Sequence, residues 1–132
     1  MNLKIITQEK IIFDGEVDEI YTCGTDGEFG ILKHHIPIMA ALDIGVTKVK
    51  IGNNYKSFTT MGGILQFKDE ECLILTTLAE PGDEIDEMRA KESLDRGRRL
   101  LREANARIDS KKVSASIARA KARLKAKLNE GN

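Results

Sequence analysis

The charge and the periodicity of this 132-residue chain both change at one point, the dipeptide Pro81-Gly82. Residues 1–84 carry 7 Lys and Arg against 14 Asp and Glu, a balance of −7, and residues 85–132 carry 14 against 7, a balance of +7. Apolar residues alternate at period two before this dipeptide and recur at helical spacing after it. The sequence therefore predicts two domains, 1–84 and 85–132, joined at a turn.

Short runs of alternating apolar residues, broken by Gly, Asn and Asp, fill the first segment. The clearest run is Val46–Ile51, after which Gly52-Asn53 is expected to turn the chain. A second break is expected at Gly62-Gly63. The other runs that predict strands are Leu3–Ile5, Val17–Tyr21, Tyr55–Met61, Ile64–Phe67 and Cys72–Leu78. Many short strands with frequent turn residues are typical of an antiparallel β-sandwich or barrel.

Strong helix formers dominate the second segment, which predicts two helices. The first is expected from about Asp86 to Ile108, with apolar positions at Met88, Leu94, Leu101, Ala104 and Ile108. The second is marked by Val113, Ile117, Ala120, Leu124 and Leu128. Asp109-Ser110 is expected to end the first helix and cap the second. Because a lone hairpin with such narrow apolar stripes is marginally stable, we expect it to rest on another surface.

Several classes of protein and site find no support in the sequence. Cys23 and Cys72 stand alone, and adjacent histidines on an extended segment point to opposite sides, so no metal site is predicted at His34-His35. No nucleophile motif or phosphate cradle indicates an enzyme. With no signal peptide and no apolar run of about 20 residues, we expect a soluble chain in a reducing compartment, which can still belong to a membrane-attached assembly.

The basic second segment predicts an acidic partner. Nucleic acid is one polyanion that a basic helix could contact, but this segment has no aromatic residue on which bases could stack. An acidic protein surface suits the segment better. The simpler alternative is that its Lys and Arg side chains only solvate the outer helix faces.

Three short motifs occur in order along the chain. The first is Gly27–Leu32 followed by His35, Pro37 and Leu42, the second is Gly62–Leu65, and the third is Ile85–Ala90. Together they resemble the epsilon subunit of the bacterial F-type ATP synthase, and the resemblance covers essentially the whole chain. The second motif departs from the family in one position, since Ile64 stands where the family usually has an aromatic residue.

This resemblance implies a β-sandwich of about ten antiparallel strands followed by an α-helical hairpin. It implies a non-catalytic central-stalk subunit that couples proton-driven rotation to ATP synthesis, with the sandwich bound to the gamma subunit and the c-ring. The location implied is the cytoplasmic side of the cell inner membrane, as a peripheral protein. The hairpin would be regulatory: when extended it reaches the catalytic alpha and beta subunits and restrains ATP hydrolysis, and when folded down it leaves them free.

The resemblance also implies a regulatory ATP site, with ATP as a signal and no catalytic cofactor. The implied residues are Glu80, Ile85, Asp86, Arg89, Ala90, Arg96, Arg119 and Arg123. Physically, Arg89 and Arg96 share one face of the first helix, and folding the hairpin brings Arg96 level with Arg123. Guanidinium groups gathered in this way favour an anion, and they suit phosphate oxygens. The alternative is that Asp86 only caps the first helix and the arginines form a solvated or protein-docking face.

Three functions are therefore compatible with the sequence. The first is a rotor subunit that couples and regulates ATP synthesis, whose stalk-facing sandwich surface would be apolar and include part of Gly30–Leu42. The second is a β-sandwich binding module whose basic tail docks RNA or another acidic molecule. The third is a small hydrolase. Recovery with the gamma subunit, recovery with RNA alone, or steady ATP turnover by the isolated chain would separate them.

Overall fold

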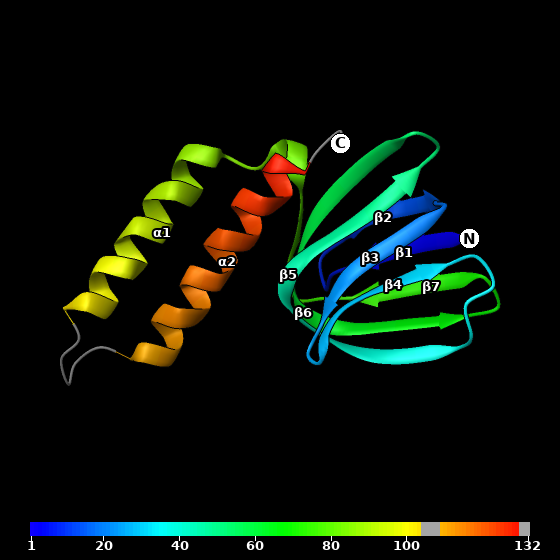
Figure 1. The fold of residues 1–132 in the computed structure, drawn as a ribbon, viewed down its shortest axis with the longest axis horizontal. Coiled ribbons are helices and arrows are strands. Elements are labelled where there is room, and N and C mark those ends of the chain that lie inside the picture. Colours follow the sequence, from blue (N-terminus) through cyan, green and yellow to red (C-terminus); the bar gives the residue numbers. More distant parts are fainter. Residues whose placement is uncertain (104–108, 130–132) are drawn as a thin grey trace.

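The computed structural model describes residues 1–103 and 109–129, which form eight strands, a 3₁₀ turn and two helices (Figure 1). The strands precede both helices in the chain. Their bounds are β1 (Asn2–Ile6), β2 (Ile11–Glu16), β3 (Glu19–Gly24), β4 (Gly27–Leu32), β5 (Ile38–Ile51), β6 (Asn54–Lys68), β7 (Glu71–Leu75), β8 (Ala79–Pro81), η1 (Gly82–Glu84), α1 (Glu87–Arg102) and α2 (Ser110–Leu128).

The long strands β5 and β6 run through both layers of the sandwich. One half of β6 pairs with β7 through Ile64–Lys68, and the other half pairs with β8 through Phe58–Thr60. The layers are therefore β2-β1-β7-β6-β5 and β8-β6-β5-β3-β4. The predicted sandwich is therefore confirmed, with eight strands of which β5 and β6 belong to both layers. Its strands are mostly antiparallel, as expected, but β1 pairs with β7 in parallel.

The predicted break at Gly62-Gly63 is wrong, because β6 continues through it. Both glycines have positive φ, 78° and 128°, so they bend the strand instead of ending it. A side chain on Gly63 would overlap the carbonyl oxygen of Leu75. The sequence analysis also missed β2, β4, β8 and the first half of β5. In β2 three apolar residues follow one another at Ile11–Phe13, so the alternation that predicts a strand is absent there.

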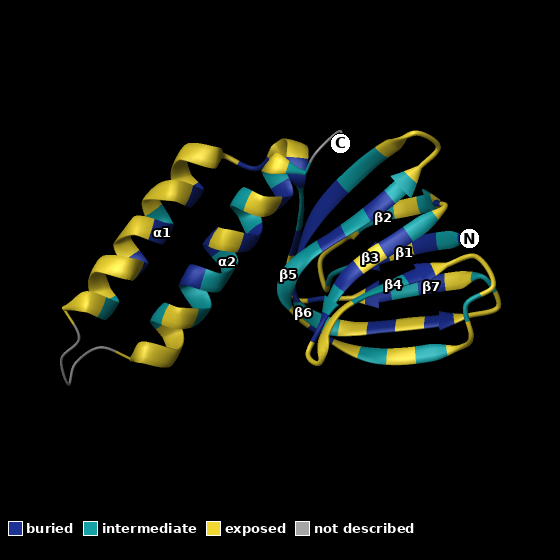
Figure 2. Ribbon diagram, in the orientation of Figure 1, coloured by how far each residue is buried: buried dark blue, intermediate teal, exposed yellow. Residues whose placement is uncertain are grey.

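A single apolar core lies between the two layers (Figure 2). Phe58 and Phe67 are its largest buried side chains, and the rings of Phe13 and Phe58 meet edge to face at 5.4 Å. A buried hydroxyl row crosses one layer, since Thr47 Oγ1 lies 2.8 Å from Thr22 Oγ1 and 3.2 Å from Thr60 Oγ1. This row satisfies polar groups that would otherwise be costly to bury.

Each helix begins at an aspartate cap. Asp86 Oδ1 accepts a hydrogen bond from Arg89 N at 3.1 Å, and Asp109 Oδ1 accepts from Lys111 N and Lys112 N. The predicted cap at Asp109 is therefore confirmed. The first helix was predicted to reach Ile108, but α1 ends at Arg102; the predicted positions Ala104 and Ile108 lie outside the described residues.

The second helix lies between α1 and the sandwich (Figure 1). It packs against β5, β6 and η1, and its face toward them carries buried alanines, Ala122 and Ala126. The two helices share a small apolar cluster of their own around Leu94 and Ile117, separate from the core of the sandwich. The hairpin therefore rests on the sheet, as expected. Neither of the two described helices combines the length and the apolar character needed to cross a bilayer.

Candidate functional site

A cavity of about 400 Å³ opens where β8, η1, α1 and α2 meet. This volume lies within the range of small-molecule sites. It is lined by Glu80, Glu84, Ile85, Asp86, Arg89, Ala90, Glu92, Ser93, Arg96 and Arg123. Seven of the eight residues named from the sequence are thus brought together, from positions 80 to 123.

The sandwich holds the first part of this cavity in place. Glu80 belongs to β8, opposite Thr59 of β6, and its backbone N–H donates to Thr59 Oγ1 at 3.0 Å. After the 3₁₀ turn, Ile85 is buried, as is Ala90 on the first turn of α1. These two residues form an apolar wall between the charged groups. The cap bond places the carboxylate of Asp86 at the start of α1, so Asp86 caps the helix and also lines the cavity.

An ion pair closes the cavity from the side of α2. Arg123 Nε donates to Glu80 Oε1 at 2.7 Å, and the two side chains are 27% and 33% exposed. Nearby, Lys127 Nζ donates to the carbonyl oxygen of Asp83 at 3.4 Å. The joint between the sandwich and the hairpin is therefore bonded to the last turns of α2.

Carboxylates accompany the arginines of the cavity: Glu80 and Asp86 were expected from the sequence, and Glu84 and Glu92 were not. Four acidic residues line it beside three arginines. The cavity therefore has no excess of positive charge, and repulsion among the arginines is not a sufficient reason to expect a bound anion. Arg89 and Arg96 nevertheless form no ion pair with any residue in the described ranges. Their guanidinium groups are available to a phosphate-bearing ligand.

The sequence analysis missed Glu84, Glu92 and Ser93. Ser93 follows Arg89 by four residues and precedes Arg96 by three, so the spacing that placed the arginines on one face also indicated Ser93. Arg119 stands apart from the others. It is half-buried on α2, one turn before Arg123, but it does not line the cavity, and its part in the site stays a prediction.

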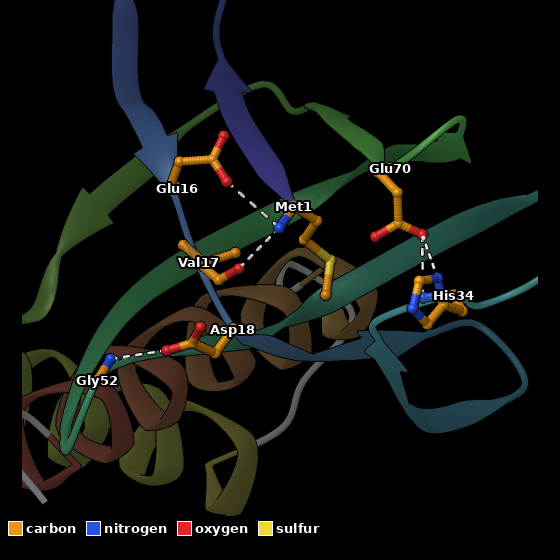
Figure 3. Close-up of polar contacts among 7 residues, drawn as sticks. All are labelled: Met1, Glu16, Val17, Asp18, His34, Gly52 and Glu70. Carbon is orange, nitrogen blue, oxygen red and sulfur yellow. Dashed lines mark hydrogen bonds and ion pairs between the residues drawn. The ribbon is translucent and has the colours of Figure 1, made fainter.

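Each residue of the histidine pair contacts another side chain, and Figure 3 shows the contact of His34 with Glu70. The backbone N–H of His34 donates to Glu70 Oε1 at 2.9 Å, and its ring Nδ1 lies 3.8 Å from the same oxygen. The ring of His35 meets Phe67 edge to face at 5.9 Å. Within residues 1–103 and 109–129, no group of three His, Cys, Asp or Glu side chains is placed to hold a metal ion.

The two cysteines are free thiols in different settings. Burial raises the pKa of the Cys72 thiol to about 12. Burial also raises the pKa of Cys23, with a smaller effect from Asp43. Cys23 lines a cavity of about 270 Å³ together with Ala118 and Ala122, so it lies where α2 rests on the sandwich.

Solved structures share the fold at low sequence identity. A chain in the cryo-EM structure of the Euglena gracilis mitochondrial ATP synthase, OSCP/F1/c-ring, aligns with a TM-score of 0.82 and 23% identity, covering 96% of this chain and 79% of that one. A chain in the Tetrahymena thermophila mitochondrial ATP synthase, central stalk/c-ring, aligns with a TM-score of 0.63 and 18% identity, covering 96% and 95%. These likenesses establish the architecture alone.

Sequence relatives and domain families identify the chain. It is 37% identical over 125 residues to the ATP synthase epsilon chain of Syntrophobacter fumaroxidans, covering 95% of this chain and 93% of that one, and 36% identical to the epsilon chain of Rippkaea orientalis, covering 96% and 95%. Residues 1–82 match the ATP synthase delta/epsilon chain β-sandwich domain, and residues 83–127 match its long α-helix domain. The chain therefore belongs to the ATP synthase delta/epsilon chain family, as an epsilon chain and a non-catalytic subunit.

Proposed function

We propose that this chain is a rotor subunit in the central stalk of an F-type ATP synthase, where it couples proton-driven rotation to ATP synthesis. The support is its family membership together with its likeness to chains solved in a central stalk/c-ring assembly. Its location would be peripheral, on the cytoplasmic face of the inner membrane, held there by the gamma subunit and the c-ring.

An exposed apolar row on the sandwich supports docking on the stalk. The strand register aligns Ala41, Ile64, Leu75 and Ile6 across β5, β6, β7 and β1. Ile64 and Leu75 are 49% and 47% exposed, and exposed apolar groups gathered in this way are typical of interaction sites. Replacing Leu75 with Lys should therefore reduce recovery of this chain with the gamma subunit. Lys56→Glu, at the opposite end of β6, is the control.

The two-helix part, beginning near Ile85, is proposed as the regulatory domain. Its contact surface on the sandwich is built from small residues such as Ala122 and Ala126, so separating the two exposes little apolar surface. When extended, the basic helices would reach the catalytic alpha and beta subunits and restrain ATP hydrolysis. When folded down, as in this structure, they leave those subunits free.

ATP is the proposed regulatory ligand of the cavity at the joint. The observation that carries this proposal is that seven predicted residues from β8, the joint, α1 and α2 line one cavity. Arg89 and Arg96 would bind the phosphates, while Asp86 and Glu80 would accept hydrogen bonds from the ribose or the base. Because the lining comes from both helices and the sandwich, ATP binds only the folded-down hairpin and stabilises it.

The test is titration of the isolated chain with ATP while its thermal stability is followed. We expect the melting temperature to rise at millimolar ATP, since a ligand that binds only the folded state stabilises it. The rise should be lost in Arg123→Ala and kept in Arg98→Ala, which removes an exposed arginine outside the cavity. An unchanged melting temperature in the wild-type chain would remove ATP as a ligand and leave the rotor role standing.

A further inference from the structure

Ser93 lies inside the cavity at the joint, on the same face of α1 as two of its arginines. It follows Arg89 by one helical turn and precedes Arg96 by another. Its side chain is half-buried, at the boundary with a second, smaller groove between the two helices. A ligand whose phosphates reach both arginines would therefore pass the Ser93 hydroxyl.

The helix itself does not account for a serine at this position. Serine is a weaker helix former than alanine, and in a helix interior its hydroxyl commonly bonds to the carbonyl four residues earlier. The Ser93 hydroxyl forms no hydrogen bond with any described residue. The group is a donor that is left available on the wall of a cavity.

Because carboxylates line the cavity, an uncharged hydrogen-bond donor is well suited to bind a phosphate there. Glu84 and Glu92 line the same cavity, and their carboxylates repel phosphate oxygens that approach Arg89 and Arg96. A hydroxyl adds a hydrogen bond to an anionic oxygen without adding a counter-charge that these carboxylates would neutralise. Hydrogen bonds to charged acceptors are stronger than those between neutral groups.

We infer that Ser93 is a further nucleotide-positioning residue, whose hydroxyl donates to a phosphate oxygen held between Arg89 and Arg96. This inference rests on the proposed function of the cavity and assigns one more contact within it. The ligand class is a nucleoside polyphosphate, because the group recognised is a phosphate oxygen next to two guanidinium forks.

The experiment compares ATP affinity and unliganded stability in the full-length chain and three variants. Ser93→Ala removes the hydroxyl and should weaken ATP binding about tenfold, the effect of losing one hydrogen bond to a charged group. The same variant should melt no lower than wild type without ATP, because alanine is the better helix former. Ser93→Thr keeps a hydroxyl and should retain most of the affinity. Ser116→Ala, across the neighbouring groove on α2, should bind like wild type.

The outcomes separate this inference from the proposal on which it rests. Unchanged ATP affinity in Ser93→Ala, with the loss in Arg123→Ala intact, would overturn the role of Ser93 and keep the nucleotide site. Equal losses in Ser93→Ala and Ser93→Thr would also overturn it, because the hydroxyl would then not be the cause. If wild type itself binds no ATP, the inference and the proposed site fall together.

Discussion

Arg123 on α2 and Glu80 on β8 form an ion pair of 2.7 Å across 43 positions of the chain. It ties the helical hairpin to the sandwich beside the cavity at the joint. Both side chains stay about one-third exposed, so this is a contact at the surface and not part of a shared core. The separate apolar clusters of the sandwich and the hairpin agree with two bodies in contact.

We expect the Arg123–Glu80 pair to contribute only about 0.2–1 kcal/mol, as exposed ion pairs do. A double-mutant cycle with Glu80→Gln and Arg123→Gln, followed by urea unfolding, measures this coupling. The coupling should shrink as salt is added, because salt screens exposed charges. A coupling of several kcal/mol that salt leaves unchanged would mean that hairpin and sandwich form one buried unit.

Gly63 should tolerate no side chain, whereas Gly52 should tolerate one at moderate cost. Both have positive φ, but a Cβ at Gly63 would overlap the backbone of Leu75, and a Cβ at Gly52 meets nothing within 4 Å. Gly52→Ala should therefore cost about 1–2 kcal/mol, from the left-handed backbone alone. Gly63→Ala should cost more than that, or prevent folding. Equal unfolding free energies for the two variants would contradict the bend seen in β6.

The close packing of α1 on α2 at Gly97 is testable by a second pair of variants. A Cβ on Gly97 would lie 2.6 Å from Ile117 Cγ1. Gly97→Ala should destabilise the hairpin by about 1–3 kcal/mol through overpacking, despite its better helix propensity. Amide hydrogen exchange in α1 measures the effect. In an Ile117→Ala background the same change should cost clearly less, and an equal cost in both backgrounds would exclude this contact as the cause.

The buried thiol of Cys72 should make stability fall with rising alkaline pH. Its pKa rises from 9.0 to about 12 through burial, so the unfolded chain releases the proton first and the folded state is favoured less as pH increases. From about pH 9 to 12 the loss approaches about 1.4 kcal/mol per pH unit. The comparison is the unfolding free energy of wild type and Cys72→Ala as a function of pH. Parallel curves would show that Cys72 does not cause the loss.

The helical half of this molecule was readable from local patterns, whereas much of the sandwich was not. Helical spacing located α1 and α2, and Asp109 signalled its cap, because these features depend on residues within one turn. The bend at Gly63 depends on Leu75, a partner on another strand, and so two predicted strands proved to be one. A pair of glycines alone does not distinguish a bend from a turn.

The residues of the candidate site that belong to the sequence motif or follow helical spacing could be predicted. Arg96 and Arg123 were expected at one level, and both line the cavity. The carboxylate of Glu84 could not be foreseen, because its place depends on the 3₁₀ turn that folds it toward α1. Arg119 does not line the cavity, although it lies one turn before Arg123 on α2, and its part in the site stays a prediction.

The proposed regulation requires a hairpin that can leave the sandwich and act elsewhere in the synthase. The most direct measurement is ATP hydrolysis by the whole complex, assembled with the full chain or with a chain ending at Glu84. We predict faster hydrolysis with the shortened chain, because no helix is left to restrain the catalytic subunits. Equal rates from two fully assembled complexes would contradict the regulatory role of residues 85–132.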